Sequence, residues 1–269
     1  MRTKLLTIYT TMKKLFLLLA LVGMVATACE DDGVNEPTTP EDKTQPIKFI
    51  DNTVKALCVD SWDTNGDAEL SYEEAAAVTD IGITFRSSDI ISFTELAYFT
   101  GLSYIANEAF MCCESLKKIE LPHNITSIGD YVFYGCDSLE SVTIPYSVTT
   151  IGSVAFYGCN KLTSVTIPDS VTTIGESAFS YCDSLTSFYG KFASEDNRCL
   201  IVDGKLIAFA PVGLTEYTIP DSVTSIGGSA FCDCDSLKSV TIPDSVTEIG
   251  GPAFFSCSSL TSFYGKFAS

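Results

Sequence analysis

The chain has 269 residues, and its 34 acidic and 16 basic side chains leave a formal net charge of -18. Binding to nucleic acid needs clustered lysine and arginine, so this acidic balance argues against a nucleic-acid partner. The chain holds one histidine, which leaves little room for a Ser-His-Asp or Cys-His arrangement and favours a protein that is not an enzyme.

Residues 1–28 predict a secretion signal. Two lysines at positions 13–14 precede an apolar run over residues 15–25, which is too short for a membrane-spanning helix of about 20 residues. The small residues directly before Cys29 resemble a bacterial lipobox, which implies that Cys29 becomes a lipidated mature N-terminus. In that interpretation Met12 is a better start than the first methionine.

Residues 29–46 contain the lipidated cysteine and a segment with almost no apolar side chains. This composition predicts a disordered tether, since such a segment cannot bury enough apolar surface to fold. Its acidic start at residues 30–32 resembles the tag that sends lipoproteins of some anaerobic Gram-negative bacteria to the outer face. We therefore expect a lipid-anchored protein exposed at the surface of a bacterial outer membrane.

Residues 47–80 predict a helix–loop–helix of the EF-hand kind, with helices over residues 47–62 and 71–78. Between them, oxygen-bearing side chains recur at the spacing with which an EF-hand loop binds calcium. The candidate calcium ligands are Asp63, Asn65, Asp67, Glu69, Ser71 and Glu74. An EF-hand normally has glycine where this chain has Ala68, a departure that lowers the expected affinity. The alternative interpretation is an acidic turn that is merely structural.

Residues 81–104 are irregular, with a short helical candidate over residues 93–99, and we expect them to cap the first coil of a repeat region. From residue 105 to 269 the chain repeats itself, and Gly129, Gly152 and Gly175 mark a period of 23 residues. Each repeat carries Ile-Gly, Ala-Phe, Cys, Leu, Val and Ile-Pro at fixed positions. Because one such unit cannot bury its own apolar face, this period predicts stacked coils. We expect one short parallel strand per coil, at the Leu, Val and Ile-Pro positions.

An insertion interrupts the repeats near residues 188–215. The Asp203-Gly204 pair lies between apolar runs there and predicts a β-hairpin. The sequence of residues 186–194 recurs identically at residues 261–269. We expect the last coil to lack an obvious cap, so that either an edge is exposed for pairing or the sequence is a truncated member of a longer series.

The outward-pointing positions of the repeat strands form the predicted binding face. The candidate ligand-binding residues are Lys117, Lys118, Glu120, Glu140, Thr143, Thr166, Tyr189, Lys238, Thr241 and Tyr264. A face rich in hydroxyls with some Tyr and Lys suits adhesion, because solenoids present extended binding surfaces. Equally, Ser and Thr could be solvated filler compatible with strands. The cysteines at one repeat position are expected to be free and to pack as small apolar residues.

The repeated phrase resembles the BspA-like leucine-rich-repeat family over residues 105–269, and the acidic loop resembles the EF-hand-like module that some members carry. The resemblance implies an α/β leucine-rich-repeat solenoid on a bacterial surface, preceded by a small helical segment. It also implies adhesion to host matrix glycoproteins or to other bacteria. We therefore interpret the chain as a surface adhesin or protein-binding module, with calcium as a cofactor. The alternative is a glycan-binding accessory protein of a nutrient-uptake system.

Overall fold

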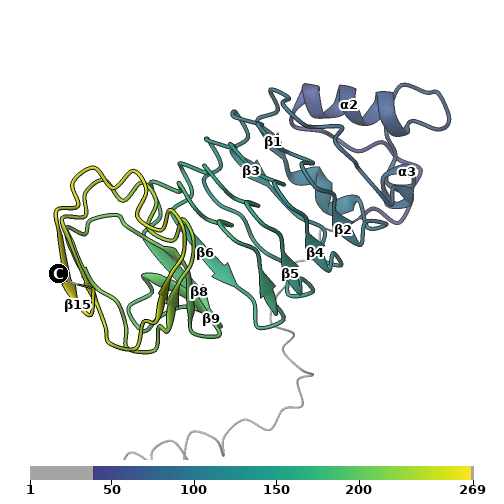
Figure 1. Ribbon diagram of the computed structural model, residues 1–269. Helices are drawn as coiled ribbons and strands as arrows, with labels where there is room; N and C mark the ends of the chain where they lie inside the picture. The colour runs from purple at the N-terminus through teal and green to yellow at the C-terminus, as the bar shows by residue number, and fades with distance from the viewer. Residues whose placement is uncertain (1–38, 268–269) are drawn as a thin grey trace, which may run out of the picture. The chain divides into compact units, whose positions relative to one another are not determined.

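The computed structural model describes residues 39–267, which fold as a leucine-rich-repeat solenoid of parallel strands with a small helical segment before it (Figure 1). The fold class predicted from the repeat is confirmed. The predicted signal, Cys29 and the start of the tether lie outside the described residues. None of the helices in the described part is long and apolar enough to span a membrane.

The helical segment consists of α2 (Asn52–Trp62) and α3 (Tyr72–Ala77), and a 3-10 helix, η1 (Thr94–Tyr98), follows within the first coil. Helix α2 begins later than the predicted residue 47, because the Asp51 carboxylate accepts hydrogen bonds from the amides of Thr53 and Val54 and caps the helix there. Helix α3 begins with a capping box.

Most coils contribute two short strands rather than the one expected, although the coil that contains Ser141 has only an isolated bridge in the first series. The first strand series contains β1 (Ser92–Phe93), β3 (Lys118–Ile119), β6 (Ser164–Ile167), β8 (Ser187–Gly190), β11 (Glu216–Thr218), β13 (Ser239–Ile242) and β15 (Ser262–Gly265). The second series contains β2 (Tyr104–Ile105), β4 (Ser127–Ile128), β5 (Thr150–Ile151), β7 (Thr173–Ile174), β12 (Ser225–Ile226) and β14 (Glu248–Ile249). The second series forms at the Ile-Gly position, outside the predicted strand, because the backbone there pairs in register with the next coil.

A stack of phenylalanine rings fills the centre of the coils. The rings of Phe110 and Phe133 lie 5.5 Å apart and almost parallel, and Phe133 and Phe156 follow at 5.1 Å. All three side chains are fully buried. Each such ring stabilises the fold by roughly 1.5–3 kcal/mol through its burial, plus about 0.5–1.5 kcal/mol for each ring pair.

The stack begins before residue 105, where we expected the first coil. Phe85 lies 5.4 Å from Phe110 and accepts a hydrogen bond from the Cys113 thiol, as Phe110 does from Cys136. Strand β1 also pairs with β3. The segment predicted as a cap therefore contains an eroded coil, with Ser88 where later coils have cysteine.

The cysteine series is free, and its thiols, except that of Cys234, donate to backbone carbonyls of the preceding coil. The Cys159 sulfur lies 3.3 Å from the Phe133 oxygen, and the Cys182 sulfur lies 3.2 Å from the Phe156 oxygen. Burial raises the pKa of Cys182 to about 12. These thiols are structural donors that hold the phenylalanine segments of neighbouring coils together.

Strands β9 (Cys199–Val202) and β10 (Lys205–Phe209) form an antiparallel hairpin that divides the repeats. Its turn residues Asp203 and Gly204 have φ of 49° and 78°, as a two-residue hairpin turn requires. The described residues contain two hydrophobic cores, and both receive side chains from this hairpin. Leu200 and Ile207 enter the core of the coils before it, whereas Cys199 and Leu206 enter the core of the coils after it.

Candidate functional site

The first strand series has a polar outer face, which is the predicted binding face. In β6, Ser164 and Thr166 are exposed while Val165 and Ile167 are buried. This alternation follows from the two-residue period of a strand, which sends successive side chains to opposite faces. The inward side chains of such a strand thus pack in the core, and its outward side chains are available to a partner.

Parallel register aligns the outward side chains into rows across the coils. Thr166 lies beside Tyr189 where β6 pairs with β8. Thr241 likewise lies between Thr218 and Tyr264 in the sheet formed by β11, β13 and β15. Neighbouring members of a row are about 4.8 Å apart, so a row can follow an extended polypeptide or glycan.

All ten predicted ligand-binding residues except Thr241 are exposed, and Thr241 is half-buried. All the charged ones except Lys238 lie in the early coils, where Lys118 and Glu120 form a salt bridge with a nitrogen–oxygen distance of 3.5 Å. Thr241 and Tyr264 lie on the sheet formed by β11, β13 and β15, and Lys238 directly precedes β13; this sheet is not paired with β6 and β8, which lie before the hairpin. The structure therefore divides the predicted site into two patches on either side of the hairpin.

Other threonines of the repeats have a structural role. The Thr149 hydroxyl donates to the carbonyl of Thr126 at 3.1 Å, and the Thr172 hydroxyl donates to the carbonyl of Thr149 at the same distance. Thr186 bonds to Thr163 in the same way. These threonines thus tie each coil to the one before it, a structural role that differs from the solvated filler considered as an alternative.

A series of tyrosines that sequence reasoning missed lies next to the phenylalanine stack. Tyr134 and Tyr157 are stacked with ring centroids 5.1 Å apart, and Tyr157 and Tyr181 follow at 4.7 Å. Burial raises the pKa of Tyr157. The signal was present in the sequence, because a tyrosine directly follows the repeat phenylalanine in two coils. Each of these rings thus has at least one neighbouring tyrosine ring in contact with it.

The predicted calcium loop is held by its own hydrogen bonds. The two carboxylate oxygens of Asp63 accept from the amides of Gly66 and Ala68, at 2.7 and 2.9 Å. Ala68 adopts a φ of 66°, so it supplies the left-handed turn for which an EF-hand normally uses glycine. The loop therefore reaches the turned conformation despite the substitution, at the cost of a strained alanine.

Glu74, the expected bidentate ligand, is engaged at both of its oxygens. One oxygen accepts from the amide of Thr64 at 2.9 Å, and the other accepts from the amide of Ser71 at 2.9 Å. Burial acts to raise the pKa of Glu74, but these hydrogen bonds lower it to about 2. The ionised carboxylate thereby joins the start of the loop to the start of α3.

The loop pairs with the segment that precedes α2. The amide of Ile47 donates to the carbonyl of Leu70 at 2.8 Å, and Pro46 and Ser71 form an antiparallel bridge. Glu69 forms a salt bridge with Lys55 of α2, with a nitrogen–oxygen distance of 2.6 Å. The loop that begins at Asp63 is thus supported by the segment that precedes α2 in the same chain.

As a donor set, the carboxylate, amide and hydroxyl oxygens of the loop suit a hard cation such as calcium. Within residues 39–267, no three acidic, histidine or cysteine side chains already converge as a group that could hold a metal ion. Glu69 points to Lys55, and Glu74 is committed to its amide donors. Calcium binding would therefore require side chains to exchange hydrogen bonds for the cation.

A parallel-stranded solenoid with an exposed polar strand face defines a leucine-rich-repeat protein. Six copies of the BspA type leucine rich repeat region match the chain, over residues 84–195 and 206–266. The chain belongs to this family. The match begins at residue 84, in agreement with the eroded coil around Phe85.

Two solved structures illustrate the likeness. A leucine rich cell surface protein from Faecalibacterium prausnitzii is 32% identical with a TM-score of 0.53, over 61% of this chain and 51% of that chain. A leucine-rich repeat protein from Bacteroides ovatus is 30% identical with a TM-score of 0.38, over 61% of this chain and 53% of that one. The chain thus matches about half the length of each. No curated protein matches it.

Proposed function

We propose that this protein is a surface-exposed bacterial lipoprotein that binds other proteins through the outer face of the first strand series. The observation that carries the proposal is the alignment of exposed Thr166 with Tyr189, and of Thr241 with Tyr264, in parallel register. Tyrosines contribute strongly to protein interfaces because they bury a large area at little conformational cost. The family and the cell-surface relative support the same assignment.

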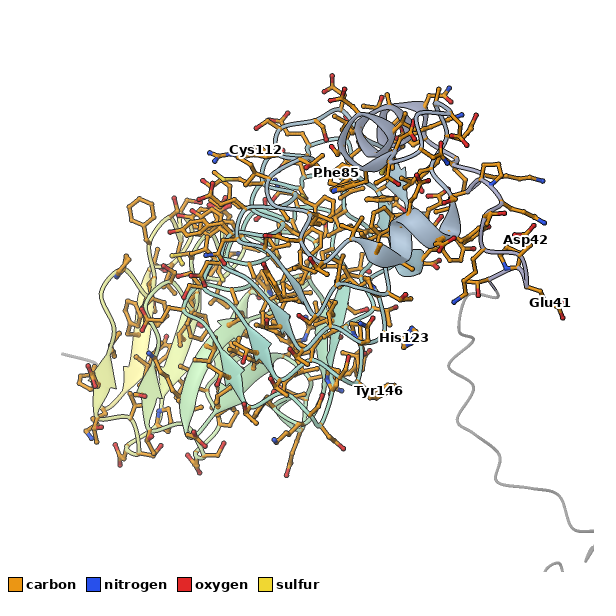
Figure 2. All side chains as sticks on the ribbon, turned by 90° about the vertical axis from the view of Figure 1, so that its right-hand side faces the viewer. Glu41, Asp42, Phe85, Cys112, His123 and Tyr146 are labelled. Carbon is orange, nitrogen blue, oxygen red and sulfur yellow. The ribbon has the colours of Figure 1, made fainter. Side chains whose placement is uncertain are left out.

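The partner class is a host matrix glycoprotein or a protein on another bacterium. Purified protein without the leader is applied to immobilised fibronectin or fibrinogen and, in parallel, to a polysaccharide array. We expect saturable binding to a protein surface, weakened about tenfold or more by the double substitution Thr166→Glu and Tyr189→Ser. The matched control is Tyr146→Ser, since Tyr146 is 75% exposed but lies outside the strand face (Figure 2).

A glycan-binding accessory role is the second candidate, favoured by the exposed rings of Tyr189 and Tyr264 on the strand face. Aromatic rings are common contacts for the apolar faces of sugars. Binding to the polysaccharide array alone, lost in Tyr189→Ser, would replace the adhesin proposal with this one. Sugar release by the purified protein, abolished by a single carboxylate substitution, would instead indicate an enzyme.

The anchor is proposed to be the lipidated Cys29, on the basis of the small residues before it and the short apolar run. Mass spectrometry of the mature N-terminus tests this directly. We expect an acylated Cys29 and release of the protein from membranes in Cys29→Ser. An unmodified N-terminus produced by ordinary signal cleavage would contradict the anchor without affecting the strand-face proposal.

Calcium is the proposed ligand of the loop that starts at Asp63 and ends at Glu74. Its chemical contribution would be structural, because a bound cation would neutralise the carboxylates and fix the loop against α2 and α3. Calorimetry should show uptake of one calcium ion, lost in Asp63→Ala. The absence of heat at about millimolar calcium, the weak end of the range for extracellular calcium modules, would leave the loop as a structural acidic turn.

A further inference from the structure

The return side of each coil is the stretch that runs from its Ile-Gly position to its repeat cysteine. Backbone hydrogen bonds join the return sides of neighbouring coils in a ladder of their own. Before the hairpin β9–β10, for example, the amide of Phe133 donates to the carbonyl of Ala155 at 2.7 Å. After the hairpin, the amide of Phe231 donates to the carbonyl of Ala253 at 2.8 Å. This ladder thus holds coils together in both halves of the solenoid, the coils before the hairpin and the coils after it.

The ladder is broken at the junction of the two halves, between the coil that contains Phe179 and the coil that contains Phe231. Among residues 39–267, the amides of Phe179 and Tyr181 donate to no backbone carbonyl of the later coil. The phenylalanine stack is divided at the same place. Phe179 packs edge-on against Phe188. Phe231 packs instead against Phe209 of the hairpin. The two halves therefore meet without the return-side bonds that join neighbouring coils elsewhere.

A side-chain contact and a cavity occupy the return side of this junction. The Ser180 hydroxyl donates to the carbonyl of Ser229 at 3.1 Å. Beside it lies a cavity of about 10 Å³, roughly the least space that one water molecule needs. The lining of the cavity includes Asp183 from the earlier half and Asp233 from the later half. Because protein interiors are normally packed with few such voids, the junction is a weak point of the return side.

The opposite side of the junction is continuous. The amide of Phe188 donates to the carbonyl of Asn197 at 2.8 Å, which ties the earlier half to the hairpin. Leu206 of β10 pairs in parallel with Ile226 of β12, which ties the hairpin to the later half. Because backbone bonds cross one side of the junction and a cavity lies on the other, motion of the two halves turns about the hairpin and opens the return side, as in a hinge.

Two carboxyl groups lie together on the return side of this hinge. Asp183 and Asp233 are within hydrogen-bonding reach of each other. Partial burial and the charge of Asp233 raise the pKa of Asp183 to about 6. One shared proton lets the pair form a hydrogen bond, whereas two ionised carboxylates repel each other. The interaction across the hinge therefore changes from attraction to repulsion when the shared proton is lost.

The other titratable groups around this pair do not compensate its charge. They are acids, phenols and thiols: Asp137, Asp235, Tyr157, Tyr181, Cys182, Cys232, Cys234 and Cys257. None of these side chains can carry a positive charge, so none offsets the repulsion between two ionised carboxylates. The charges of Asp137 and Asp235 add to that repulsion.

We propose that the solenoid bends at this junction, and that the carboxyl pair of Asp183 and Asp233 controls the bend. With one shared proton, the hydrogen bond between the carboxyls keeps the return sides of the two halves together. When both carboxylates are ionised, their repulsion opens the return side and the halves turn about the hairpin. Because each half carries one of the two patches of the strand face, the bend changes the angle between these patches.

Hydrogen exchange of the full chain measures this opening, when it is compared at pH 5 and pH 7.5 after correction for the intrinsic change in exchange rate. The reporting segments are residues 179–183 and 229–233, and residues 131–136, in an uninterrupted coil, are the internal control. We expect the reporting segments to exchange about tenfold faster at the higher pH. Linkage gives this change in the opening equilibrium for a carboxyl whose pKa falls from about 6 to the ordinary 3.8 on opening. Residues 131–136 should show no such change.

Two pairs of variants test the proton control and the hinge separately. Asp183→Asn should abolish the pH difference, because an amide does not ionise, whereas Asp169→Asn, at an exposed turn, should preserve it. Ser180→Ala should speed exchange of the reporting segments at both pH values, because it removes the hydrogen bond across the junction. Its matched control is Ser170→Ala, which removes a hydroxyl bond of 2.7 Å to the carbonyl of Val148 within uninterrupted coils and should leave the reporting segments unchanged.

Two results would overturn the proposal. Equal exchange of the reporting and control segments at both pH values would show that the junction is not a hinge. A pH difference that persists in Asp183→Asn would show that the carboxyl pair does not control it. Neither readout requires a partner bound to the strand face, so failure of the hinge and failure of the adhesion proposal are distinguishable.

Discussion

Gly152 lies directly against the backbone of Gly129 in the preceding coil. A Cβ atom placed on Gly152 would be 2.5 Å from both the carbonyl carbon and the carbonyl oxygen of Gly129. Such a distance is far inside van der Waals contact, and the obstructing atoms are backbone, which cannot rotate away. The glycine of the Ile-Gly position is therefore what allows neighbouring coils to approach within pairing distance at the second strand series.

Gly152→Ala should accordingly destabilise the solenoid by roughly 1–3 kcal/mol or more, because two coils must separate to admit the methyl group. The measurement is urea unfolding followed by circular dichroism. The matched control is Gly251→Ala, since a Cβ at Gly251 meets nothing within 4 Å. Equal effects of the two substitutions would contradict the close-approach explanation.

Phe156→Ala removes the middle of the phenylalanine stack, where Phe133 and Phe179 lie 5.1 and 5.2 Å away. We expect a loss of about 3–5 kcal/mol in the free energy of unfolding, since the cavity is enclosed on both sides by rigid rings. Phe255→Ala is the control, because this side chain is 60% exposed. It should change stability little, and a comparable loss there would argue against a continuous core.

The hydrogen bonds to Glu74 make the stability of the helical segment depend on pH. The pKa of this carboxyl is lowered to about 2 in the folded protein, so its contribution is fully present above the ordinary value near 4.5. That contribution is lost as the pH falls from 4.5 through about 2. Glu74→Gln should lower stability at neutral pH and remove this part of the acid dependence. Glu73→Gln, on the exposed neighbour, should do neither, as thermal unfolding at several pH values can show.

Asp183 should give the stability of the protein the opposite dependence on pH. Burial, together with the nearby carboxylate of Asp233, raises the pKa of Asp183 to about 6. The folded state therefore binds a proton on the Asp183 carboxyl more tightly than the unfolded state does. The stability that this difference contributes is fully present below about pH 4 and is lost as the pH rises through 6. Asp183→Asn should raise the melting temperature at pH 7.5 and leave it unchanged near pH 4. Asp169→Asn, at an exposed turn position, serves as the control.

The sequence repeat predicted much of the fold. The spacing of Gly129 and Gly152 predicted the stacked coils, and the alternation around Val165 correctly assigned the exposed face of the strands. The paired strands at the Ile-Gly position were missed, since a two-residue strand has no period of its own to detect. The coil around Phe85 was missed for a related reason: its serine and altered spacing removed the repeat signature while the packing survived.

For the candidate sites, the sequence by itself determined which residue types recur and at what spacing: the oxygen ligands between Asp63 and Glu74, and the identical segments that contain Phe188 and Phe263. Only the tertiary structure decided that Phe188 is fully buried, and that the predicted strand face is split into two patches. The physical reason is that local spacing sets where a side chain points along its own strand. What that side chain meets depends on a hairpin whose two faces pack into different cores.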